Sequence, residues 1–355
     1  MTTPTLPPET ITRSGRTLQV TRAWPVPDEA RLAIECQDAG QRIAGHWDHN
    51  GAQLQPLGSD SRIPALERLA ATGTVVSHRP GKRAVVRRDE EFIKVVRRGR
   101  ASGILDGVRR AAAFTDFFRT PEVLAQDDSS VTFAELHGAS LHDPSLLSAP
   151  HWDLAWTEVL SAWAEAASTA GSSSSRQDSR NHTPGTRPSQ LRHTAEVEGQ
   201  VLRRWASLVA PYLDPAERLH RLVDDVATSL GQLPEVPLRP AHRDLHDKQL
   251  LWSPQAGPGL LDVDTACVAD PALDLGNLRA HARLRRLQGL WGPAEARTVT
   301  QAVDVAAARL HVPTRTLAIY ERAAELRLGC VYAVRPGYRD VAARLRAGTV
   351  SSAER

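Results

Sequence analysis

The sequence lacks any apolar run long enough to cross a membrane, which would take roughly 20 consecutive apolar residues. Its beginning, MTTPTLPPETITRSGR, has neither the basic nor the apolar region of a secretory signal peptide. We therefore expect a cytoplasmic protein with no membrane partner. The chain is also poor in cysteine: it has only Cys36, Cys267 and Cys330, and no two of them form a C-x-x-C pair. This spacing argues against a disulfide framework and against a structural zinc site.

Lysine is scarce as well. Of the 44 basic residues, only Lys82, Lys94 and Lys248 are lysine, and the rest are arginine. A lysine kept against this bias indicates a site that needs a compact point charge on a flexible stem. Charges of both signs are interspersed and the net charge is +3, so the sequence does not predict a nucleic-acid partner. It predicts no particular oligomeric state.

Periodicity divides the chain into three regions. Polar and apolar residues alternate between turn signals over residues 17–57, which predicts a small β-meander within residues 1–62. Residues 63–137 show a short helix, three β-rich runs, a second helix and a further strand. Residues 138–355 are mostly helical, except for 168–190, a Ser-, Gly- and Pro-rich stretch that we expect to be a mobile loop. The predicted fold class is α+β.

Two acidic segments flank a predicted β-hairpin. HRDLHDKQLL, residues 242–251, leads into its first strand, and LDVDTACVADPALDL, residues 261–275, follows its second strand. Asp244 and Asp262 can therefore face one pocket. Phosphoryl transfer needs such a pair, because one carboxylate takes or orients the proton of an attacking hydroxyl group and another holds Mg²⁺.

Four motifs occur along the chain in the order found in a known family. HRDLHDKQLL resembles a catalytic loop, H-x-D-x-x-x-x-N, and LDVDTACVADPALDL resembles a metal-binding segment. EFIKVV resembles the strand that carries the ATP lysine, and TFAELHG resembles the hinge. Over about residues 74–278 the chain resembles the aminoglycoside phosphotransferase and choline kinase-like small-molecule kinases. This resemblance implies a two-lobed protein-kinase-like fold, with a β-rich N-lobe (63–137), a helical C-lobe (138–355) and an N-terminal β extension or cap (1–62).

The resemblance also implies which residues form the site. His242 and Asp244 would be catalytic, and Asp262 and Gln249 would hold Mg²⁺. Gln249 replaces the family's asparagine and offers the same amide oxygen from one methylene further out. The nucleotide is ATP by family default, or GTP, and its expected contacts are Lys94, Gly81, Lys82, Lys248 and the hinge backbone at Ala134 and Leu136.

In this family Lys94 would pair with an acidic residue of the next helix, and the sequence offers Asp106 early in that helix and Asp116 late. Asp106 is the candidate. The family's G-D-P reads A-D-P here. We expect Asp270 and Asp274 to be structural, with Asp274 bonding to the backbone of the catalytic loop.

The acceptor should be a small molecule. Only seven residues separate Asp262 from Asp270, which leaves no room for the peptide-docking segment of protein kinases. Acidic and basic residues are roughly balanced over 138–355, which disfavours a polycationic aminoglycoside. Asn277 and His281 lie one helical turn apart, and either line the acceptor pocket or form a structural pair.

These observations predict an ATP-dependent phosphotransferase that moves the γ-phosphate of Mg·ATP to a hydroxyl group of a small molecule. A sugar, amino sugar, aminocyclitol or antibiotic would fit. The alternative is a catalytically inactive, nucleotide-binding member of the same fold that acts as a regulatory module. Its support is the glutamine at position 249 and the absence of a clear helix partner for Lys94.

Overall fold

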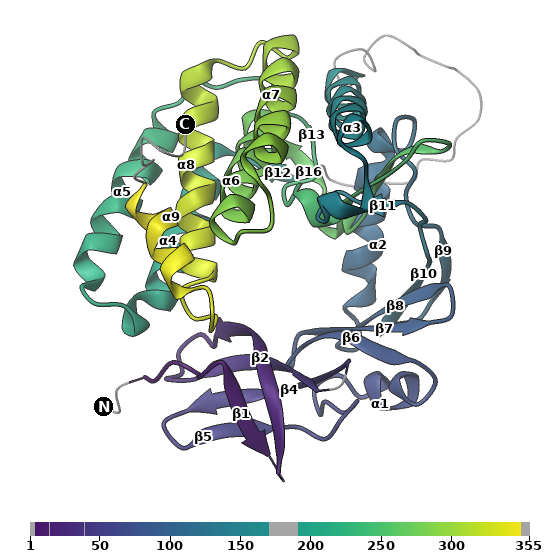
Figure 1. Ribbon diagram of the computed structural model, residues 1–355, viewed down its shortest axis with the longest axis vertical. Coiled ribbons are helices and arrows are strands. Elements are labelled where there is room, and N and C mark those ends of the chain that lie inside the picture. The colour runs from purple at the N-terminus through teal and green to yellow at the C-terminus, as the bar shows by residue number, and fades with distance from the viewer. Residues whose placement is uncertain (1–3, 14, 39, 170–190, 349–355) are drawn as a thin grey trace.

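The computed structural model describes residues 4–13, 15–38, 40–169 and 191–348. Its N-terminal part is rich in strands and its C-terminal part is helical, which confirms the α+β class (Figure 1). Of the loop predicted at 168–190, residues 170–190 lie outside the described residues. Ser168 and Thr169 end a long helix instead.

The first sheet is an antiparallel meander, as predicted. Its strands lie in chain order, β1 (Thr10–Arg13), β2 (Arg16–Pro25), β3 (Leu32–Asp38), β4 (Gln41–Asp48) and β5 (Gly51–Leu54). Leu18, Val20 and Ile34 are buried on these strands. They belong to one apolar cluster with residues of the C-terminal helices, so this sheet packs against the C-terminal part.

The second sheet has the strand order β6-β7-β8-β10-β9. Its strands are β6 (Thr74–Arg79), β7 (Arg83–Arg88), β8 (Glu91–Val96), β9 (Val123–Gln126) and β10 (Ser130–Ala134). Helix α1 (Ala65–Ala70) covers one face, where Ile93 and Val95 of β8 join the same apolar cluster as Leu66. Because alternate strand residues point to opposite faces, Lys94 points away from α1. Helix α2 (Ala101–Arg110) follows β8 and packs against β10.

Two small sheets hold the acidic segments. One contains β11 (Ala139–Ser140), β14 (Leu250–Ser253) and β15 (Gly257–Leu260), and the other contains β12 (Arg192–His193), β16 (Cys267–Ala269) and β13 (Arg239–Ala241). The predicted hairpin is confirmed, since β14 and β15 pair antiparallel with Leu250 opposite Leu260. The segment 242–249 therefore connects β13 to β14, and the segment 261–266 connects β15 to β16.

The C-terminal part is built mainly from helices. They are α3 (Ala149–Thr169), α4 (Ala195–Val209), α5 (Ala216–Gly231), α6 (Ala272–Leu287), α7 (Pro293–Arg309), α8 (Thr314–Val331) and α9 (Arg339–Ala347). Helix α6 is central and packs against α7 and α8 (Figure 1). Gly276 permits the approach to α8, because an added Cβ would lie 2.6 Å from the backbone nitrogen of Glu321. Within the described ranges, no helix combines the length and apolar character that a membrane span requires.

Tryptophans form the core between α3 and α7. The rings of Trp152, Trp156 and Trp291 meet edge to face, with the centroids of Trp152 and Trp291 5.3 Å apart. Trp163 is fully buried, and its Nε1 donates a hydrogen bond to Asp274 Oδ2 on α6. This core therefore supports the part of α6 that lies under the catalytic loop.

Candidate active site

A cavity of about 380 Å³ lies between the second sheet and the C-terminal part. Val85, Phe92, Phe133 and Leu251 are among its apolar lining residues. Its polar lining comes from β8 and from both acidic segments, and includes Lys94, Gln249, Asp262 and Asp264. Apolar walls with a few convergent polar groups are typical of small-molecule sites.

Lys94 lies at the centre of the charged groups in this cavity. Its Nζ is 2.6 Å from Asp262 Oδ1 and 2.7 Å from Asp264 Oδ1, and it lies 5.3 Å from the centroid of the Phe133 ring. Burial raises the pKa of Asp262, but the charges of Lys94 and Arg83 outweigh this effect and bring the pKa to about 2. The Asp262 carboxylate is therefore ionised at neutral pH.

The prediction that Asp106 pairs with Lys94 is wrong in this structure. Asp106 is half-exposed and pairs with Arg109 on its own helix. Asp264 provides the second carboxylate for Lys94, and α2 approaches it closely because Gly107 has no side chain: a Cβ there would lie 2.5 Å from Asp264 Cα. Sequence reasoning missed Asp264, although the alternation Asp-Val-Asp at 262–264 was a signal for it.

Asp274 fixes the catalytic loop, as predicted. Its carboxylate accepts hydrogen bonds from the backbone N–H groups of His242 (2.7 Å) and Arg243 (2.8 Å). The same two bonds hold Arg243 in a left-handed conformation with φ of 72°, which is uncommon for residues other than glycine. His242 is buried, and its Nε2 donates to the Leu261 carbonyl at 2.8 Å. His242 therefore joins the segment 242–249 to the segment 261–266.

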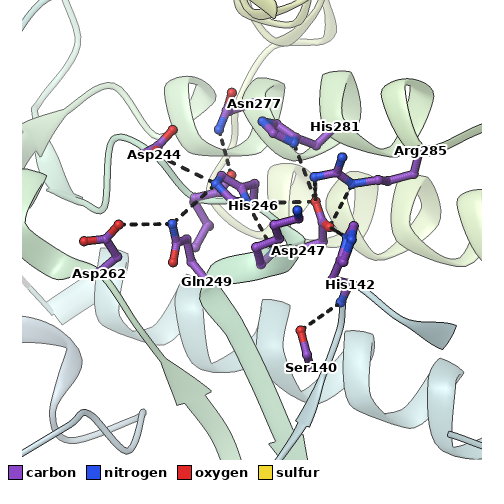
Figure 2. A network of polar contacts seen from close by, with 12 residues as sticks. Ser140, His142, Asp244, His246, Asp247, Gln249, Asp262, Asn277, His281 and Arg285 are labelled. Carbon is purple, nitrogen blue, oxygen red and sulfur yellow. Dashed lines mark hydrogen bonds and ion pairs between the residues drawn. The ribbon is translucent and has the colours of Figure 1, made fainter. Parts of the chain in front are cut away.

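Asp244 projects from the loop with 45% of its side chain exposed. Its Oδ2 is 3.9 Å from His246 Nε2 (Figure 2). Desolvation raises the pKa of Asp244, but His246 and Arg327 outweigh that effect and lower the pKa below its usual value. The carboxylate is therefore ionised and accessible, as a proton acceptor must be.

Gln249 and Asp262 meet at the same edge of the cavity. Gln249 Nε2 lies 3.4 Å from Asp262 Oδ2 (Figure 2). The oxygen and nitrogen of a glutamine amide exchange places when the amide group rotates by half a turn. The amide oxygen of Gln249 can therefore also point toward Asp262. One carboxylate and one amide oxygen are ligands that suit Mg²⁺.

Beside Asp244 lies a buried network centred on Asp247 (Figure 2). Asp247 Oδ2 accepts from His142 Nδ1 at 2.5 Å and from Arg285 Nε at 2.9 Å, and Oδ1 accepts from Arg285 Nη2 at 3.1 Å. Burial raises the pKa of Asp247, but the hydrogen bond from His142, the close approach of His281 Nδ1 at 3.5 Å and the charge of Arg285 hold it well below its usual range. Sequence reasoning missed this network.

His246 and His281 stack with ring centroids 4.5 Å apart. His246 Nδ1 accepts the Lys248 N–H, so the neutral ring carries its proton on Nε2, the atom that faces Asp244. The ligand atoms of His246, Asp247 and His281 lie within 4.8 Å of one another. Arg285 already forms two hydrogen bonds with Asp247, so a metal ion would compete with a guanidinium there, and we interpret the cluster as an ion-pair network.

Asn277 is a structural residue. Its Nδ2 donates to the Leu245 carbonyl at 2.8 Å, and its Oδ1 accepts from Arg327 Nη2 at 2.6 Å. Both ends of the amide are thus engaged, and the side chain is buried. His281 belongs to the Asp247 network, so the alternative of a structural role fits both residues.

The other residues predicted to contact the nucleotide do not all line the same cavity. Ala134 and Leu136 line the same cavity as Lys94. Gly81 and Lys82, in the turn between β6 and β7, line a different cavity. Lys248 is exposed next to Asp247 and does not belong to the lining of the Lys94 cavity.

Comparisons with known proteins agree with this arrangement. The model of the family described as phosphotransferase enzyme family matches residues 83–311. A solved choline/ethanolamine kinase family protein from Mesorhizobium loti is 16% identical, covering 82% of this chain and 92% of that chain with a TM-score of 0.51. That similarity shows a shared fold.

Two further solved structures are similar at lower scores. An aminoglycoside phosphotransferase from Streptomyces rimosus is 20% identical, with 71% of this chain and 89% of that chain covered and a TM-score of 0.48. A glucosamine kinase is 18% identical, with 93% and 91% covered and a TM-score of 0.46. No curated protein matches the sequence.

Proposed function

The chain belongs to the phosphotransferase enzyme family, and we propose that it transfers the γ-phosphoryl group of Mg·ATP to a hydroxyl group of a small molecule. The observation that carries this proposal is the convergence of Lys94, Asp262 and Gln249 on one cavity, with the ionised Asp244 on the neighbouring loop. These residues come from three separate segments of the chain, and the phosphotransferase reaction needs each of them in a distinct role.

The nucleotide would occupy the cavity that Lys94 lines. Adenine would lie between Phe133 and Leu251. The backbone N–H of Ala134 already donates to the Glu122 carbonyl, so Ala134 would offer its carbonyl oxygen to the base. Lys94 would exchange part of its contact with Asp262 and Asp264 for the α- and β-phosphates. GTP remains the second candidate nucleotide.

Asp262 and Gln249 fit a Mg²⁺ ion by their donor chemistry, and Asp264 lies close enough to contribute. A bound Mg²⁺ would neutralise charge on the phosphate oxygens. The charge of Lys94 lowers the pKa of Asp262 and keeps it ionised in the free protein, so this carboxylate is ready to bind a cation. His242 and Asp274 hold the loop and the metal-binding segment in register.

Asp244 would accept the proton of the acceptor hydroxyl. Its lowered pKa keeps it in the basic form, and its exposed side chain can reach a bound alcohol. The Nε2–H of His246 points toward the same carboxylate and would orient it. Two observations favour this proposal over the alternative of an inactive regulatory member: Gln249 lies next to Asp262, and Asp264 is a carboxylate partner of Lys94.

The acceptor would be a sugar, amino sugar, aminocyclitol or another small polar alcohol. The charged side chains that lower the pKa of Asp244 most strongly are His246, Arg327 and His281, and the carboxylate of Asp247 in the same loop is already paired with Arg285. A polycationic acceptor would find few free carboxylates here. This environment supports a neutral or weakly charged acceptor.

Each of the three regions of the chain would have its own role. Residues 63–137 would bind the nucleotide, and residues 138–355 would carry the catalytic loop and the acceptor pocket. Residues 1–62 would act as an extension that braces both, since the first sheet packs on the C-terminal helices and its strands β3 and β4 contact β6.

A coupled ADP-release screen tests the proposed function. The panel comprises sugars, amino sugars, aminoglycosides, macrolides and choline-like alcohols, each with the wild-type protein and with Asp244→Asn. We expect Mg²⁺-dependent turnover of at least one small alcohol by the wild type only. Turnover of a protein substrate with none of the small alcohols would overturn the proposal.

A further inference from the structure

A second cavity, of about 540 Å³, lies between the first sheet, the β6–β7 turn and helix α4. It shares no lining residue with the cavity of Lys94. Trp24 on β2, Gly81 in the turn and Trp205 on α4 line three of its sides. The cavity is therefore formed jointly by the N-terminal sheet, the second sheet and the C-terminal part.

The lining of this cavity is strongly cationic. Seven of its residues carry a positive charge, and only two, Glu29 and Asp60, carry a negative one. The seven cations are Arg31, Arg62, Arg79, Lys82, Arg97, Arg204 and Arg243. They come from every part of the chain that forms the cavity, so the charge is a property of the assembled site and not of one basic segment.

The two carboxylates do not neutralise these cations. Glu29 pairs with Arg31. Asp60 accepts hydrogen bonds from His78 Nε2 (2.9 Å) and from the N–H groups of Gly81 (2.7 Å) and Arg62 (2.9 Å), so it holds the turn in place. Among the described residues, the other six cations of the cavity form no ion pair.

Two of these cations contact neighbouring uncharged groups although they lack counter-charges. Arg97 Nε donates to the Gly81 carbonyl at 2.6 Å, and the Arg79 guanidinium lies 5.2 Å from the centroid of the Trp24 ring. Burial lowers the pKa of Lys82, and the charges of Arg97 and Arg79 lower it further. The cations are thus close enough to repel one another, and an anion between them would relieve this repulsion.

We propose that this cavity is a second ligand site, which binds a small polyanion such as a phosphorylated metabolite or a polyphosphate. Guanidinium groups present planar donors that match phosphate oxygens in pairs, and the volume is within the usual range for small-molecule sites. The bound anion would bridge the three parts of the chain. It would also contact Arg243, which directly precedes Asp244. This site is independent of the proposed phosphotransferase activity.

Isothermal titration of the full chain with inorganic pyrophosphate tests the site, at low salt and with EDTA so that no Mg²⁺ is present. Arg204→Gln removes one cation from the cavity, and its exposed side chain forms no ion pair among the described residues. Its neighbour Arg203 is also exposed but pairs with Asp224 outside the cavity, so Arg203→Gln is a control of equal charge.

We expect pyrophosphate to bind the wild type, with affinity about tenfold weaker in Arg204→Gln and unchanged within about twofold in Arg203→Gln. Lys94→Ala should retain pyrophosphate binding, because Lys94 lies in the other cavity. The proposal is overturned if the wild type does not bind pyrophosphate. Equal losses in the two arginine variants, or loss of binding in Lys94→Ala, would also overturn it by placing the anion elsewhere.

Discussion

At the scale of single residues, the ammonium group of Lys94 contacts two carboxylates, Asp262 and Asp264, which would otherwise repel each other. We expect Lys94→Ala to lose the stabilisation that Mg·ATP gives to the wild type, which amounts to about 2.7 kcal/mol at a hundredfold excess over Kd. The melting temperature with and without Mg·ATP measures this difference. Removal of the ammonium should also raise the pKa of Asp262 from its present value of about 2.

Lys82→Ala is the matched control, because Lys82 lines the second cavity. It should keep the full rise in melting temperature on addition of Mg·ATP. An unchanged rise in Lys94→Ala would exclude Lys94 from the nucleotide site, whereas a loss in Lys82→Ala would show that the β6–β7 turn closes over the phosphates when nucleotide binds.

Asp244 is the second residue whose role can be isolated. Asp244→Asn keeps the shape of the side chain and removes its charge, so nucleotide affinity should stay nearly constant while kcat falls by roughly 10² or more. Steady-state kinetics and nucleotide titration together measure this. Asp106→Asn removes a half-exposed charge whose one ion pair within the described ranges is with Arg109, and should leave both quantities unchanged. A fully active Asp244→Asn enzyme would rule out Asp244 as the base.

At the scale of elements, the first turn of α6 acts as the support of the catalytic loop. Asp274→Ala would leave the buried N–H of His242 and the N–H of Arg243 without an acceptor, so we expect the free energy of unfolding to fall by about 3 kcal/mol. Urea unfolding measures the loss. The control Asp304→Ala removes an exposed carboxylate on α7 and should cost about 0.5 kcal/mol or less. Equal effects of both variants would contradict the supporting role of α6.

The elements around the cavity could be predicted because their signals are local. The β-rich run of β8 places Lys94, and the turn between two short apolar runs places the β14–β15 hairpin with Asp244 and Asp262 on either side. The sequence predicts the partner of Lys94 in the next helix, but Asp264 lies far along the chain and only the close approach of α2 at Gly107 reveals it. The spacing of apolar residues in a sequence does not indicate such an approach between distant elements.

The Asp247 network shows the same limit on the prediction of the site. His142 follows β11, Asp247 lies in the catalytic loop and Arg285 is on α6, so their contact depends on the packing of three elements. Only the spacing of Asn277 and His281 on one helix was visible in the sequence. The second cavity could not be predicted either, since its cations are single arginines dispersed through a chain rich in arginine.

At the scale of the whole molecule, the pH dependence of stability sums every group whose pKa changes on folding. Burial, together with the charge of the neighbouring His246, lowers the pKa of His281 to about 3. The unfolded chain, with a histidine pKa near 6.5, therefore binds more protons than the folded chain between these two values. The contribution of His281 to the free energy of unfolding is therefore fully present above about pH 6.5 and is lost as the pH falls toward 3.

Below pH 6, we expect His281 to change the free energy of unfolding by about 1.4 kcal/mol per pH unit. His281→Gln should reduce the slope of stability against pH by nearly that amount. Denaturant unfolding between pH 5 and 7.5 measures it. Asn277→Ala is the matched control on the same helix: it removes two buried hydrogen bonds and has no titrating group, so its curve should lie below that of the wild type and parallel to it. A wild-type slope retained in His281→Gln would mean that other buried groups, such as His246, carry the pH dependence. Asp247 links His281 to the catalytic loop. Protonation of His281 at acid pH should therefore disrupt the site and the fold together.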